Sequence, residues 1–209
     1  MTIKVSIRNP HSMLNSAIKL IEKLKSKNKI DFNLEIIYDY QLMEDNEPIK
    51  GVYYNDFKIY VNPSECETDP TKYSSCGYTN DLSLFGVTIH EFCHFLAEKI
   101  YPKITSDYKK MFPTERFYLN DYSDYTLDDE IAEAMTLYIT NPYLLKLISK
   151  DHWKFFRNYF LSPVPCTQKK FFAIYQTYHQ IIKLDLQERW KISYNFEKNR
   201  FEKLKSIIK

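Results

Sequence analysis

The sequence has few of the residues that mark loop-rich or disulfide-bonded folds. Only 3 glycines occur among 209 residues, so turns that need a left-handed backbone are few and helices are favoured. The 4 cysteines form no CxxC pair, which favours free thiols in a reducing compartment. The chain opens without the apolar core of a signal peptide and has no apolar run long enough to cross a membrane. We therefore expect neither export nor membrane insertion.

What the chain does contain indicates one globular body. Hydrophobic residues make up 44% and aromatic residues 16% of the sequence, enough for a substantial core. Charge is unevenly distributed: from Lys146 onward there are 14 Lys and Arg against 5 Asp and Glu, and before it 15 against 22. The basic, aromatic tail could contact nucleic acid, but a solvated helical face is the interpretation we favour.

Residue patterns predict an α+β fold. Alternating or β-branched stretches indicate strands over 3–7, 32–40 and 52–61, the last folded into a hairpin at Asn55 and Asp56. Helical spacing and capping residues then predict a mostly helical second half. The expected helices cover 9–24, 81–101 with Asp81 or Ser83 as cap, 126–140 with Thr126 as cap, 143–149, 151–161 and 169–190. A polar connection is expected over 102–125. We assign 1–165 to one domain and 166–209 to a helical extension packed on it.

The segment VTIHEFCHFL, residues 87–96, contains the motif HExxH. Two histidines four residues apart on a helix project from one face, so His90 and His94 can bind the same zinc ion. Glu91 would then lie beside the metal, where it can take a proton from zinc-bound water as that water attacks a carbonyl. The alternative is a buried helix with two structural histidines. The uncharged flanks of the motif favour the metal site.

The third ligand must come from elsewhere in the chain. The residues after His94 lack the glycine and histidine of the pattern HExxHxxGxxH, so a carboxylate is expected. Asp129 and Glu133 lie one turn apart on a stripe of small and polar residues, so one could bind zinc while the other accepts the free N–H of a ligand histidine. The acidic candidates that open this helix are Asp128, Asp129, Glu130 and Glu133.

On this second helix, the pattern of a carboxylate, two residues, an alanine and a second acid resembles the glutamate helix of gluzincin metallopeptidases. The longer stretch AEAMTLYITNPYLLK is similar to minimal zincin domains related to the anthrax lethal factor catalytic domain, including phage-encoded ones. The resemblance implies a zincin-like fold in which Asp129 binds zinc, Glu133 orients a ligand histidine and Tyr122 faces the reacting carbonyl. The family ligand is usually glutamate, so Glu130 and Glu133 stay alternative ligands. Cys93 stands where relatives often have glycine or alanine.

The resemblance implies a zinc metalloendopeptidase that hydrolyses peptide bonds of a peptide or protein substrate. An alternative is a catalytically silent zincin-fold protein, for example a phage virion component that touches nucleic acid through its basic C-terminal helices. We expect the cytoplasm or a viral particle as its location. Expected partners include a protein of such a particle or an inhibitor, and no membrane.

Overall fold

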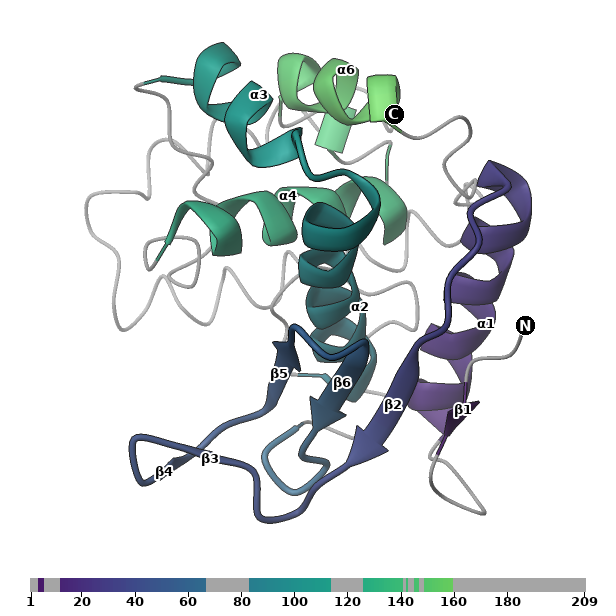
Figure 1. Cartoon of the computed structure of the whole chain (residues 1–209), viewed down its shortest axis with the longest axis vertical. Coiled ribbons are helices and arrows are strands. Elements are labelled where there is room, and N and C mark those ends of the chain that lie inside the picture. Colours follow the sequence, from purple (N-terminus) through teal and green to yellow (C-terminus); the bar gives the residue numbers. More distant parts are fainter. Residues whose placement is uncertain are drawn as a thin grey trace, which may run out of the picture.

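Figure 1 shows the computed structural model, with a small sheet at one end and helices packed against it and beyond it. It describes residues 4–5, 12–66, 83–113, 126–140, 142, 145–146 and 149–159. Mixed α and β structure is confirmed. The 166–209 extension, the helix expected over 169–190 and most of the one expected over 143–149 lie outside the described residues. No helix among the described residues is long and apolar enough to span a membrane.

The main sheet has the strand order β1-β2-β6-β5. Strands β1 (Lys4–Val5), β2 (Glu35–Tyr38) and β6 (Lys58–Val61) are parallel, and α1 (Ser12–Asn28) makes the connection from β1 to β2. Strand β5 (Gly51–Tyr54) is antiparallel to β6, as the predicted hairpin requires, with Tyr54 opposite Lys58. Among the described strands, β5 pairs only with β6 and forms one edge of the sheet.

Helix α2 (Leu84–Phe95) carries the HExxH motif through the centre of the molecule. Ser83 caps it by accepting the backbone N–H of Gly86 at 2.9 Å, so this expected helix and one of its two candidate caps are confirmed. The last turn continues as a π-helix, η1 (Leu96–Ile100), and ends before Pro102. Helix α2 packs against β5 and β6, against α1, and against α4 (Leu127–Thr140), which crosses it in Figure 1.

Two elements were not predicted. The expectation of a polar connection over 102–125 is wrong where α3 (Ile104–Met111) forms. Ile104 and Tyr108, one turn apart, are its only fully buried residues. Two buried positions in an otherwise polar segment give too weak a helical pattern to be recognised in the sequence. The second is the short hairpin of β3 (Met43–Glu44) and β4 (Glu47–Pro48). It turns at Asp45 and Asn46, both with positive φ, a conformation that these two residue types tolerate.

The helices after α3 follow the prediction closely. Helix α4 begins after Thr126 as expected, and every residue from Glu130 to Thr140 is buried. Helix α6 (Lys150–Tyr159) begins and ends within two residues of its expected bounds. It packs on α4, and Phe155 and Phe156 reach the core. Helix α4 contacts α2, α3 and α6, and Asp129 in its first turn lies 3.4 Å from His94 on the motif helix.

Candidate metal centre

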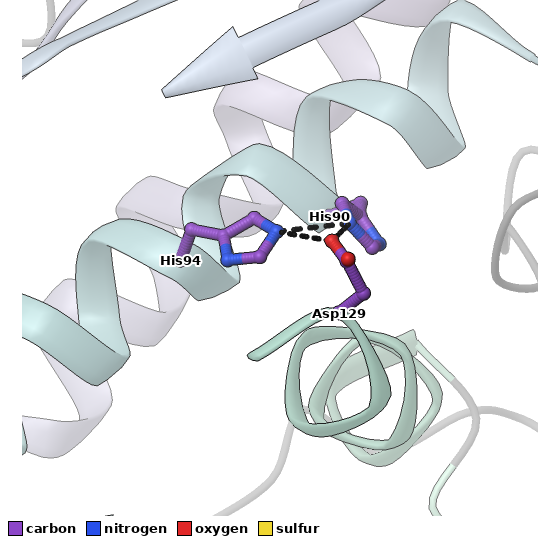
Figure 2. A group of neighbouring side chains, drawn as sticks. All are labelled: His90, His94 and Asp129. Atoms are coloured by element: carbon purple, nitrogen blue, oxygen red, sulfur yellow. Dashed lines mark hydrogen bonds and ion pairs between the residues drawn. The ribbon is translucent and has the colours of Figure 1, made fainter. Parts of the chain in front are cut away.

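Helix α2 places the two motif histidines side by side. His90 is 5% exposed, and His94, one turn further on, is partly exposed. The Nε2 atoms of the two rings lie 3.1 Å apart, and Figure 2 shows both rings turned toward the same point. Packing of α2 against the sheet and α4 fixes the histidines on the side of the helix that faces the start of α4.

Helix α4 supplies the third group. Asp129 Oδ1 lies 3.4 Å from Nε2 of His94 and 3.8 Å from Nε2 of His90. The edges of a tetrahedron of zinc ligands, drawn with Zn–N and Zn–O bonds of about 2.0–2.2 Å, measure roughly 3.3–3.6 Å. The observed separations of 3.1, 3.4 and 3.8 Å bracket that range. Two imidazole nitrogens and one carboxylate oxygen are also a donor set that zinc accepts, so the residues fit the ion.

The Asp129 carboxylate is divided between two environments. Its Oδ1 atom faces the histidines, while Oδ2 accepts a hydrogen bond from Oγ1 of Thr126 at 2.6 Å. Burial opposes ionisation of this carboxyl group, but the neighbouring imidazoles of His90 and His94 outweigh it and lower the pKa of Asp129 well below its usual range. Asp129 is therefore present as the carboxylate that a metal requires.

Glu133, one turn further along α4, contacts the other side of His90. Its Oε1 atom lies 3.0 Å from His90 Nδ1, and its side chain is fully buried. Because Nδ1 faces this carboxylate, Nε2 is the ring nitrogen turned toward His94 and Asp129. Burial disfavours a charged imidazole, but the carboxylates of Asp129 and Glu133 prevail and raise the pKa of His90 to about 10.

Glu130 points away from this cluster. Its buried carboxylate accepts a hydrogen bond from the Tyr108 hydroxyl at 2.7 Å, and that hydroxyl lies 2.9 Å from Nε2 of His152. Nδ1 of His152 in turn lies 2.7 Å from the hydroxyl of Ser149, which precedes α6. This buried chain joins α3, α4 and α6. Sequence reasoning missed this network, because its members are far apart in the sequence.

A cavity of about 980 Å³ opens beside the histidines and Asp129. Glu91 lines it, although the residue as a whole is only 9% exposed. Strand β5 borders the cavity through Gly51, Val52 and Tyr53, and η1 borders it through Ala97 and Glu98. Its described lining includes five carboxylates and no lysine or arginine: Glu44, Glu91, Glu98, Asp128 and Asp129.

Gly51 allows the edge strand to approach the motif helix. A Cβ atom added there would lie 2.6 Å from Cγ1 of Val87 and 3.1 Å from Cγ of Glu91. Only a glycine therefore lets β5 lie this close to Glu91 without displacing a neighbour. Sequence reasoning did not single out Gly51, and the scarcity of glycine in the chain was the signal that could have drawn attention to it.

Two other residues named from the sequence have different outcomes. Tyr122 lies outside the described residues. Cys93 is fully buried and accepts a hydrogen bond from Thr136 on α4 at 3.4 Å, and burial raises the pKa of its thiol above the usual range. Of the residues named as candidate ligands or catalytic groups, the structure brings together His90, His94, Asp129, Glu133 and Glu91.

No protein family, curated protein or solved structure matched the chain.

Proposed function

We propose that this chain is a zinc-dependent metallopeptidase with a zincin-like fold of the gluzincin kind. The observation that carries the proposal is the position of Glu91. Glu91 lines the same cavity as the three residues that could hold a metal. A purely structural metal site has no use for a carboxylate at that place, whereas hydrolysis needs one to accept a proton.

The residues of the site would have distinct roles in hydrolysis. His90, His94 and Asp129 would hold zinc, which when bound polarises a carbonyl and lowers the pKa of water to about 7. Glu91 would accept a proton from the attacking water and later return it to the leaving amine. Glu133 would keep Nε2 of His90 turned toward the metal. The role of Tyr122 in stabilising the oxyanion stays a prediction from the resemblance.

The edge strand favours a peptide as the substrate. An extended chain can pair with the free edge of a sheet through backbone hydrogen bonds. Strand β5 has such an edge among the described strands, and residues 51–53 border the cavity that contains Glu91. A peptide paired with β5 would pass beside that carboxylate.

The charge of the cavity favours cationic peptides. With a divalent ion in place, the five lining carboxylates leave a formal net charge of −3. A concave, acidic surface concentrates positive ligands and speeds their association, and salt weakens this effect. We expect a peptide with lysines beside its cleaved bond to react faster than its glutamate counterpart, with the difference shrinking as ionic strength rises.

A peptide-library assay tests the proposal. The zinc-loaded protein is incubated with a mixed peptide library, and products are identified by mass spectrometry. The best substrate is then used to compare wild type with Glu91→Gln. We expect the substitution to lower kcat by about 10²–10⁴-fold while zinc content stays at the wild-type level. The matched control is Glu44→Gln, which removes an exposed carboxylate from the same cavity and should leave kcat unchanged.

The proposal fails if zinc-loaded wild type cleaves no peptide, or if Glu91→Gln retains full activity. Two histidines and one carboxylate also suit non-haem iron(II). Elemental analysis of the purified protein therefore accompanies the assay, and iron in place of zinc would contradict the assignment of the metal.

A further inference from the structure

We propose that Thr126 is a positioning residue that holds Asp129 so that a single carboxylate oxygen is offered to the metal. The inference rests on the metal site of the proposed function and concerns its affinity and coordination. Thr126 precedes α4 as its N-cap and lines the same cavity as the two histidines. Sequence reasoning gave it the capping role alone.

The Thr126 hydroxyl makes two hydrogen bonds with one residue. It accepts the backbone N–H of Asp129 at 3.0 Å and donates its own proton to Asp129 Oδ2 at 2.6 Å. In a standard capping box the acidic residue at this position reaches back to the backbone N–H of the cap residue. Here the carboxylate instead takes the hydroxyl proton. A short hydrogen bond to an ionised carboxylate is among the stronger kinds.

This arrangement determines which oxygen remains for the metal. Because Oδ2 is occupied by Thr126, the atom near the histidine nitrogens is Oδ1. Binding through one oxygen gives three protein donors and leaves a fourth position for a substrate or water, as catalytic zinc sites require. If the carboxylate rotated, both oxygens could contact the ion, and that position would be crowded. The branched side chain of Thr126 also restricts its own rotation, which keeps the hydroxyl in place.

A second contact anchors the same turn of α4 without touching Asp129. Tyr108 donates its hydroxyl proton to Glu130, which is 1% exposed, at 2.7 Å. This bond fixes the helix from its buried side, whereas Thr126 fixes the ligand from its exposed side. Tyr108→Phe is therefore a matched control, because it removes a hydrogen bond to the same turn of α4 but no contact of Asp129.

The test measures zinc affinity by competition with a chromogenic chelator, together with the melting temperature of the metal-free proteins. Loss of an outer hydrogen bond to a metal ligand typically lowers affinity by about 10–100-fold. We expect such a loss in Thr126→Val and in Thr126→Gly, and near wild-type affinity in Thr126→Ser. Thr126→Gly is the variant least expected to misfold, because glycine is nearly as favourable as threonine at an N-cap. Tyr108→Phe should lower the melting temperature and leave zinc affinity unchanged.

Cobalt(II) substitution supplies a spectroscopic measurement of coordination. A tetrahedral cobalt site absorbs more strongly in the visible range than a five- or six-coordinate one. We expect strong bands for wild type and Thr126→Ser, and weaker bands for Thr126→Gly, in which Asp129 is free to bind through both oxygens. Wild-type affinity and spectra in Thr126→Gly would overturn the inference and leave the proposed peptidase intact. A wild type that holds zinc but cleaves nothing would overturn only the peptidase, and a wild type that takes up no zinc would overturn both.

Discussion

Replacing Glu133 tests whether the buried carboxylate behind His90 supports the metal site. Glu133 is fully buried, and its Oε1 atom lies 3.0 Å from Nδ1 of His90. Glu133→Leu removes both the acceptor and its charge, and should weaken zinc binding by about 10–100-fold, or about 1.4–2.7 kcal/mol. Glu133→Gln keeps an oxygen acceptor but not the charge. Charged hydrogen bonds are about twice as strong as neutral ones. The loss of zinc-binding free energy in Glu133→Gln should therefore be about half as large as in Glu133→Leu.

The assay is chelator competition on the folded variants, with melting temperatures recorded with and without zinc. Removing one partner of a buried ion pair destabilises a protein by about 3–5 kcal/mol, and each kcal/mol lowers the melting temperature of a chain of this size by about 2–4 °C. The metal-free Glu133→Leu variant should therefore melt well below wild type. A folded Glu133→Leu variant that binds zinc as tightly as wild type would refute the role given to Glu133.

Two further predictions concern packing and pH. Gly51→Ala places a methyl group 2.6 Å from Val87 and 3.1 Å from Glu91. We expect chemical denaturation to show that the variant is about 1–3 kcal/mol less stable than wild type, and peptide cleavage to be slower. Unchanged stability and cleavage rate would contradict the close approach of β5 to α2. A hydrogen bond from Tyr159 lowers the pKa of Asp107. A carboxyl group whose pKa is lowered by folding stabilises the protein above its unfolded-state pKa near 3.9, and this stabilisation is lost as the pH falls. Tyr159→Phe should therefore lower the melting temperature at pH 6 but not at pH 2. An equal decrease at both pH values would exclude this contribution of the Tyr159–Asp107 hydrogen bond.

The local parts of the site could be predicted from the sequence because their information is local. The helical spacing of His90 and His94, and the capping signals of Ser83 and Thr126, lie within a few residues of the groups they position. The structure places the motif and the acidic helix as helices that pack on each other. The sequence left both Asp129 and Glu130 as ligand candidates, because the rotation of α4 about its own axis decides which of them faces the histidines. That rotation is determined by the elements packed around α4.

Other features depend on contacts between distant segments. Tyr108 and His152 are 44 residues apart, and neither the network that joins them nor the short helix α3 has a periodic signal strong enough to detect. The second role of Thr126 was also hidden. A capping threonine and a metal-binding aspartate are each recognisable alone, but the hydrogen bond that couples them depends on side-chain orientation.

The most direct test of the metal centre is the metal content of the purified protein, measured by elemental mass spectrometry after zinc loading and removal of free metal. Wild type is compared with Asp129→Ala and with Asp128→Ala, an aspartate in the same turn of α4 that lines the same cavity. We expect about one zinc per chain in wild type and in Asp128→Ala, since a catalytic site binds one ion through three protein ligands, and little or none in Asp129→Ala. No zinc in loaded wild type, or zinc retained in Asp129→Ala and lost in Asp128→Ala, would contradict the assignment of His90, His94 and Asp129 as the metal ligands.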